Sequence, residues 1–79
     1  MLKVGTIVRY HPNWCSEGER KYIHVVREVG LLNPCTDKPT RVLIETLNTN
    51  LTFHPTEVVE EFMIEDMGMT IEDLVSYAS

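Results

Sequence analysis

The sequence predicts a mainly β domain: a small antiparallel sheet of four to five strands followed by a short C-terminal helix. Three observations support this fold class. Short segments rich in β-branched residues alternate with stretches rich in Pro, Gly and Asn. An N-cap residue followed by an apolar stripe at helical spacing is clear only in the last ten residues. The 79 residues, 9.1 kDa in all, provide one small core, so we expect a single domain over residues 1–79.

The first half of the chain predicts two strands separated by a long loop. Residues 3–10 alternate loosely, which places Val4, Thr6, Val8 and Tyr10 on one face, and Gly5 suggests a bend or bulge. Residues 11–20 contain turn-forming residues and are expected to form a loop. Residues 21–29 are the expected second strand.

A hairpin is the clearest local expectation in the middle of the chain. Residues 30–40 are expected to form a loop, because Pro34 and Pro39 interrupt them. Residues 41–47 are the third expected strand, with the core residues Val42 and Ile44. A turn at residues 48–50 and a short return strand at residues 51–54 complete a hairpin over residues 41–54.

Residues 56–67 fit two interpretations. Val58, Val59, Phe62, Met63 and Met67 recur at helical spacing, which would make residues 56–67 a helix in an α+β fold. The alternative is a turn at residues 55–58 followed by a strand through Phe62 or Ile64. We favour the turn and strand, because a fifth strand would cover an exposed edge of a four-stranded sheet.

The last segment, residues 70–78, predicts a helix. Thr70 is a suitable N-cap, and Asp73 lies three residues later as an acidic variant of the capping box. Ile71, Leu74, Val75 and Ala78 form one apolar stripe. A helix of this length is not stable alone, so it is expected to dock on this chain or on a partner.

The strand pattern resembles that of SH3-like small β-barrels over residues 3–64. The resemblance is carried by the opening V-G-T-I-V-R-Y, by the long first loop, and by the sequence F-H-P-T-E-V-V-E before the last strand. It implies the architecture and not proline-rich ligand binding, because the A-L-Y-D-Y type opening of signalling SH3 domains is absent. In size and acidity the chain is also similar to accessory proteins of phages and mobile elements.

Charge is unevenly distributed along the chain. Residues 1–56 hold seven basic and five acidic side chains, net +2, whereas residues 57–79 hold seven acidic and no basic side chains, net −7. The overall charge of −5 argues against broad nucleic-acid binding, which needs a basic footprint. The N-terminus has no apolar stretch of signal-peptide length, and no apolar run spans a membrane, so we expect a cytoplasmic protein without membrane contact.

The residues for catalysis and for cofactor binding are not grouped into motifs. The four glycines are scattered, so no phosphate-binding loop is expected. Potential metal ligands lack the two closely spaced pairs of structural zinc sites; they are His11, Cys15, His24, Cys35 and His54. Both cysteines are expected to be reduced. The sequence therefore predicts a protein that is not an enzyme and has neither metal nor cofactor.

The leading functional hypothesis is a non-enzymatic macromolecule-binding module with a protein as partner, and a basic partner would complement the acidic residues 57–79. The candidate partner-binding residues are aromatic, acidic or methionine: Tyr10, Trp14, Glu60, Glu61, Phe62, Met63, Glu65, Asp66 and Met67. Trp14 is expected either to cap the core, which we favour, or to contact a ligand. One alternative is a small acidic inhibitor that mimics nucleic acid, and the second is a single-strand binder using Trp14 and Tyr22 beside Arg20 and Lys21. The sequence specifies no oligomeric state.

Overall fold

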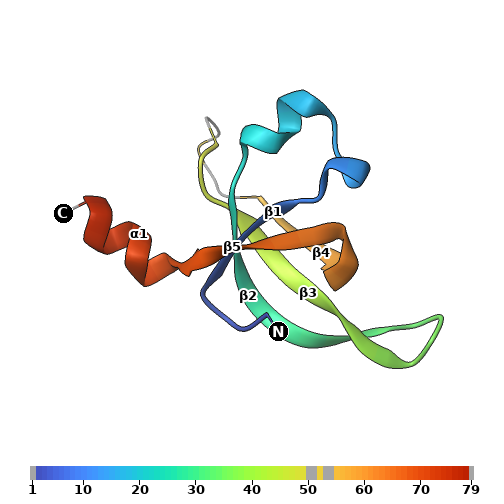
Figure 1. Cartoon of the computed structure of the whole chain (residues 1–79). Helices are drawn as coiled ribbons and strands as arrows, with labels where there is room; N and C mark the ends of the chain where they lie inside the picture. The colour runs from blue at the N-terminus through green and yellow to red at the C-terminus, as the bar shows by residue number, and fades with distance from the viewer. Residues whose placement is uncertain (1, 50–51, 53–54, 79) are drawn as a thin grey trace.

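The chain forms five antiparallel strands in one open sheet, with a short helix at the C-terminus (Figure 1). The computed structural model describes residues 2–49, 52 and 55–78. The strands are β1 (Thr6–Tyr10), β2 (His24–Asn33), β3 (Lys38–Thr46), β4 (Thr56–Glu60) and β5 (Ile64–Thr70). The helices are α1 (Ile71–Ala78) and three short 3-10 turns, η1 (Pro12–Trp14), η2 (Glu17–Lys21) and η3 (Glu61–Met63).

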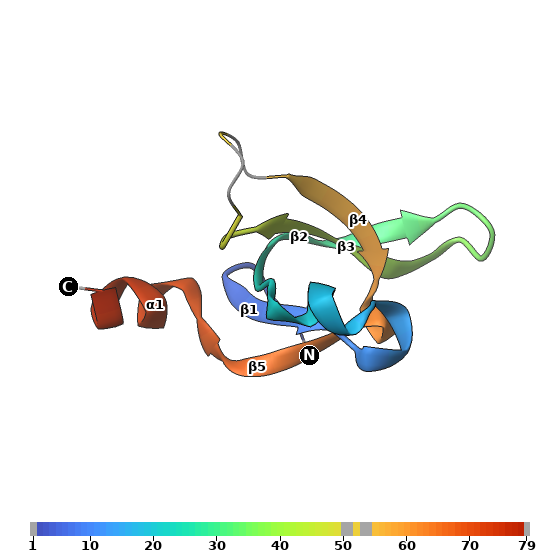
Figure 2. The ribbon, with the colours of Figure 1, turned by 90° about the horizontal axis from the view of Figure 1, so that it is seen from above.

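The strand order β4-β3-β2-β1-β5 leaves two edges, β4 and β5. Figure 2 shows these two strands on opposite sides of the sheet, joined through η3. The mainly β class with a C-terminal helix is therefore confirmed. The fifth strand covers one edge of the four-stranded sheet, as expected, because β5 pairs with β1, and β4 remains the edge on the other side. The sheet also continues past the expected end at residue 64, to Thr70.

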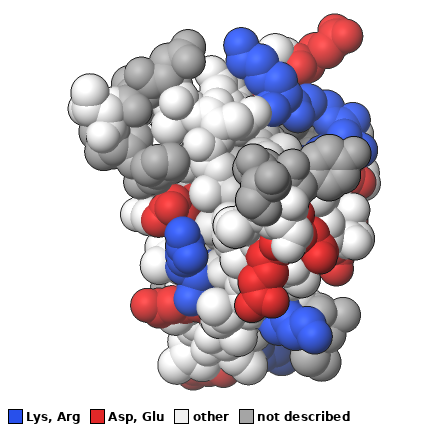
Figure 3. All heavy atoms as spheres, turned by 90° about the vertical axis from the view of Figure 1, so that its left-hand side faces the viewer, with Lys and Arg blue, Asp and Glu red and all other residues white. Residues whose placement is uncertain are grey.

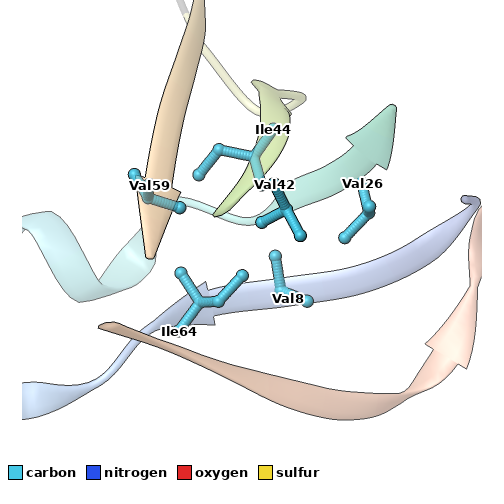
Figure 4. Close-up of a cluster of buried hydrophobic side chains, with 6 residues drawn as sticks. All are labelled: Val8, Val26, Val42, Ile44, Val59 and Ile64. Carbon is cyan, nitrogen blue, oxygen red and sulfur yellow. The ribbon is translucent and has the colours of Figure 1, made fainter. Parts of the chain in front are cut away.

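Six buried aliphatic side chains form the core on one face of the sheet (Figure 4). Every strand contributes: Val8 from β1, Val26 from β2, Val42 and Ile44 from β3, Val59 from β4 and Ile64 from β5. The expectation that Val42 and Ile44 lie in the core is confirmed. Because each strand supplies only one or two of these side chains, no strand has a stable position without the others.

The opposite face of the sheet also buries two aliphatic residues. Ile7 and Val25 are cross-strand partners with no exposed surface, and strand alternation directs them away from Val8 and Val26. Ion pairs occupy neighbouring positions of this face, Arg9 with Glu65 and Arg27 with Glu45. The long stems of such charged side chains can shield apolar surface from water.

The second loop expected at residues 30–40 is instead a strand ribbon. Strand β2 continues to Asn33 and β3 begins at Lys38, so the connection is a turn over residues 34–37. Gly30, inside β2, has a φ of 70°, and Asp37, in the turn, has a φ of 58°. These positive angles allow the strand to bend at Gly30 and the chain to reverse at the turn. The pairing between β2 and β3 contains several register shifts, and these accommodate Gly30 and Pro39, which lie in the segment expected to be a loop.

The hairpin expected at residues 41–54 has a different second strand. β3 pairs in regular antiparallel register with β4, residues 56–60. Most of the predicted return strand, like Asn50 of the predicted turn, lies outside the described residues, and Thr52 is not in a strand. Asn48 uses its side chain to tie this connection to the start of β2, accepting from Ile23 N and donating to Lys21 O, each at 2.7 Å.

Residues 56–67 contain no α-helix, which confirms our preference for a turn and a strand but reverses their order. The strand β4 comes first, and the turn η3 follows it. Val59 is buried and its neighbour Val58 is exposed, as expected in a strand. The apolar residues recur at helical spacing only because this strand is followed directly by the turn η3.

The expected C-terminal helix is present as α1, and its predicted capping is confirmed. Thr70 N donates to Asp73 Oδ2 at 2.8 Å, and Asp73 N donates to Thr70 Oγ1 at 3.3 Å. Ile71 N also donates to Gly5 O at 2.7 Å, which fixes the start of the helix beside the N-terminal segment. In Figures 1 and 2 the helix projects beyond the sheet. No helix in the described residues is long and apolar enough to cross a membrane.

We predict that Ile44→Ala lowers the free energy of unfolding by about 2–5 kcal/mol, because the side chain is 1% exposed and truncation leaves a cavity. Urea denaturation followed by circular dichroism measures the change. Leu32→Ala, at a position 63% exposed on β2, is the matched control and should change stability little. Equal loss in the two variants would contradict the proposed core.

Candidate functional site

Trp14 and Phe62 form an aromatic pair on the surface. The two rings meet edge to face with centroids 5.2 Å apart, although the residues are 48 positions apart in the chain. His11 N donates to Met63 O at 2.9 Å, which joins the start of the first loop to η3. This backbone link brings η1 and η3 together and thereby positions both rings.

The first loop, residues 11–20, is more ordered than its composition suggests. Pro12 begins η1, where its fixed φ and missing N–H are tolerated. Ser16 and Glu19 form a capping box at η2, and Tyr22 N donates to Glu19 O at its end. The loop therefore consists largely of two consecutive short helical turns, and Trp14 ends the first of them.

Trp14 does not serve as the lid over the core that we favoured. It is 50% exposed, and its partner Phe62 is 63% exposed. The partly buried apolar residues that pack against the core are Leu2, Tyr10 and Met63. The chain has few large aromatics, which made a capping role plausible, but branched aliphatic side chains fill the core instead.

A polar cluster lies at one end of the core. Tyr10 donates its hydroxyl hydrogen bond to Glu57, which links β1 to β4, two strands that are not neighbours in the sheet. His24 is 5% exposed and packs edge to face against Tyr10, with ring centroids 5.2 Å apart. Its Nδ1 lies 3.0 Å from Thr46 Oγ1, and its Nε2 is buried without a hydrogen-bond partner among the described residues.

The environment of this cluster shifts two pKa values. Burial lowers the pKa of His24, and the nearby Glu57 carboxylate acts in the opposite direction. Burial raises the pKa of Tyr10, and the hydrogen bond to Glu57 and the charges of Glu57 and Glu19 raise it further. His24 is therefore neutral and Tyr10 protonated at pH 7, which suits a structural hydrogen-bonded cluster.

Glu60, one of the candidate residues, is held by three donors of this chain. Arg41 Nε lies 2.7 Å and Asn33 Nδ2 2.6 Å from Oε1, and Thr40 Oγ1 lies 2.6 Å from Oε2. The Thr40 and Arg41 hydrogen bonds hold the pKa of Glu60 below its usual value. This carboxylate therefore anchors the end of β4 to the β2–β3 ribbon.

Glu65 has a similar internal role. Arg9 Nε lies 2.6 Å and Arg20 Nη2 2.8 Å from the same carboxylate oxygen, Oε1. These contacts lower the pKa of Glu65, chiefly through the Arg9 hydrogen bond. The acidic C-terminal part thus receives cations from the basic N-terminal part. Figure 3 shows acidic and basic side chains lying close together on the face that carries α1.

The remaining candidates occupy different surroundings. Met63 packs partly against the core, and Met67 on β5 is partly exposed. Asp66 Oδ1 accepts from Gly68 N at 2.7 Å within the same strand. Glu61 begins η3 next to Phe62. The structure therefore brings Trp14 and Phe62 into contact, whereas Glu60 and Glu65 are engaged by arginines of this chain.

Glu57 and Val58, on the strand that leads into η3, were not among the candidates. Both lie on β4, just before η3, and both are exposed. Their signal in the sequence was the short segment T-E-V-V-E, where one of two adjacent valines must face outward in a strand.

The described residues contain neither a pocket nor a group of three or more His, Cys, Asp or Glu side chains placed to hold a metal ion. Cys35 is exposed at the turn between β2 and β3, and Cys15 is partly buried, both as free thiols. Comparison of the chain with family models, curated proteins and solved structures finds no match.

We predict that stability falls as the pH is lowered below 6.5 because of His24. Its folded pKa lies below the value of 6.5 for a free imidazole, so the unfolded chain binds the proton more readily. The stabilisation is complete above pH 6.5 and declines as the pH falls toward the folded pKa. Urea titrations at pH 7.5 and 5.5 measure the difference, which His24→Gln should reduce and His11→Gln should retain. A pH dependence unchanged in His24→Gln would contradict this assignment.

We predict that Glu65 stabilises the fold above pH 4.5 and loses this effect as the pH falls through its lowered folded pKa. Glu65→Gln should therefore unfold at lower urea concentration at pH 7 and should lose less stability on acidification than the wild-type chain. Glu28→Gln, which removes an exposed charge from β2, is the control. Equal urea midpoints for the two variants at pH 7 would show that the Arg9 and Arg20 contacts contribute nothing specific.

Proposed function

We propose that this chain is a non-enzymatic module that binds another protein through a surface centred on Trp14 and Phe62. The observation that carries the proposal is the exposed contact between these two rings. Aromatic residues placed at the centre of an interface contribute a large share of binding energy. Two short helical turns hold both rings before any partner arrives, which reduces the entropy lost on binding.

The shape and charge of this surface favour a protein partner. Small-molecule sites are concave, whereas the described residues form no pocket. Arg20 is engaged by Glu65, and the Lys21 ammonium lies over the Tyr22 ring at 5.3 Å. These contacts and the net charge of −5 give little support to single-strand binding. The ion pairs of Glu60 and Glu65 likewise weaken the case for an acidic nucleic-acid mimic.

For the architecture we propose an SH3-like small barrel in the cytoplasm. The proposal is supported by the β1–β2–β3–β4 meander, the 3-10 turn η3, and the return of β5 to pair with β1. The Tyr10–Glu57 hydrogen bond supports it as well, because it connects strands on either side of the open sheet. The likeness concerns architecture, and proline-rich ligands are not part of the proposal.

We predict that the double variant Trp14→Ala/Phe62→Ala loses the partner while remaining folded. The full chain is immobilised, incubated with extract of the source organism, and the retained proteins are identified by mass spectrometry. The purified partner is then titrated, and its dissociation constant should rise at least about tenfold in the double variant, as for central aromatic contacts. Binding should also shift the Trp14 emission to shorter wavelength.

Leu32→Ala is the matched control, because it truncates an equally exposed apolar residue on the β2–β3 ribbon. Circular dichroism spectra of all variants verify that the sheet is intact. Unchanged affinity of the double variant for every retained protein would reject the proposed surface.

A further inference from the structure

The two edges of the sheet differ in how well they are protected against pairing with another chain. β5 is irregular, because its register with β1 shifts between Thr6 and Val8, and Gly68 has a φ of 76°. Asp66 also bonds the backbone N–H of Gly68. Bulges and bends of this kind hinder the addition of a further strand.

β4 has none of these irregularities. It pairs with β3 without a register shift over five consecutive residue pairs, from Arg41 with Glu60 to Glu45 with Thr56. Its segment contains no proline, glycine or lysine. In the described part of the sheet β4 has β3 as its one neighbour, so alternate N–H and C=O groups face outward from this edge.

The side chains of β4 extend this edge toward the aromatic pair. Val58 is 49% exposed, although it is a β-branched residue in the middle of a strand. Strand β4 runs directly into η3, where Phe62 contacts Trp14. A strand added to β4 would therefore place a side chain beside Val58 and end close to the proposed aromatic surface.

The charge of the β4 edge indicates which kind of strand could pair with it. The ion pairs among the described residues engage Glu45, Glu60 and Glu65, but neither Glu57 nor Glu61. A second copy would bring an equally acidic strand, and each chain carries a net charge of −5. Like charges close together oppose such pairing, whereas lysine or arginine side chains would be attracted.

We propose that β4 is a strand-addition site for an extended, basic segment of the partner protein, in which apolar residues alternate with lysine or arginine. This inference rests on the proposed function, since it describes how the bound protein is engaged. Backbone hydrogen bonds to β4 supply affinity, Val58 contacts the apolar residues, and Glu57 and Glu61 favour the basic ones.

The test uses the full chain and three synthetic hexapeptides. The first alternates Lys and Val, the second alternates Glu and Val, and the third is the Lys–Val peptide with alternate amides N-methylated to remove donors. Amide chemical shifts of the ¹⁵N-labelled chain are followed by NMR. We expect the first peptide to shift residues 56–60 saturably and more than residues 64–70, and we expect the other two to bind at least tenfold more weakly.

A pair of variants localises the effect. Val58→Lys should weaken binding of the Lys–Val peptide at least tenfold, whereas Met67→Lys adds the same charge on the β5 edge and should leave binding unchanged. Both positions are exposed, so neither substitution disturbs the core. The N-methylated peptide tests strand addition independently of any variant.

Several outcomes would overturn the inference. They are the absence of binding by the Lys–Val peptide, equal binding of the N-methylated peptide, shifts centred on β5, and a concentration-dependent dimer whose contact maps to β4. If the purified partner is lost in Trp14→Ala/Phe62→Ala but binds Val58→Lys and wild type alike, strand addition is wrong while the proposed function stands. If the partner binds the double variant unchanged, the proposed function itself fails.

Discussion

The fold depends on six aliphatic side chains that are supplied by all five strands and meet on one face of an open sheet. The two edge strands, β4 and β5, are not joined to each other by a ladder, so Val59 and Ile64 are held beside Val8 mainly by packing. Dispersion and burial act without direction, and they therefore do not fix the relative orientation of these strands. That orientation is set by directional contacts at the ends of the core.

Two such contacts determine where the proposed surface forms. The Tyr10 hydroxyl reaches Glu57 across the open side of the sheet, and the backbone of His11 bonds Met63. Because Tyr10 and His11 are adjacent, the end of β1 is tied simultaneously to β4 and to η3. The aromatic contact between Trp14 and Phe62 follows from this arrangement, so the exposed pair depends on the same two contacts that fix β1 relative to β4 and η3.

Features determined by nearby residues could be predicted from the sequence, whereas those determined by distant residues could not. The capping of α1 by Thr70 and Asp73 needs only a few residues, and the apolar alternation around Val42 and Ile44 is similarly local. The segment around Gly30 and Pro39 has the composition of a loop, yet pairing between β2 and β3 keeps it in the sheet. At the candidate site, the aromatic residues could be identified but not their contact. The partners of Glu60 and Glu65 were also hidden, because Arg9 lies 56 positions from Glu65.

Folding converts the separation of charge along the chain into pairing between strands. The cations of β1 and β3 meet the carboxylates of β5 and β4, as in Arg9 with Glu65 and Arg41 with Glu60. Glu45, Glu60 and Glu65 are paired with arginines in this way. Glu57, which accepts a hydrogen bond from the neutral Tyr10 hydroxyl, and Glu61 form no ion pair among the described residues. An edge with this charge repels its own copies and so limits the self-association that a regular, unprotected strand invites. The proposed strand-addition site relies on the same charge, because an edge that disfavours pairing with its own copies would attract a basic strand.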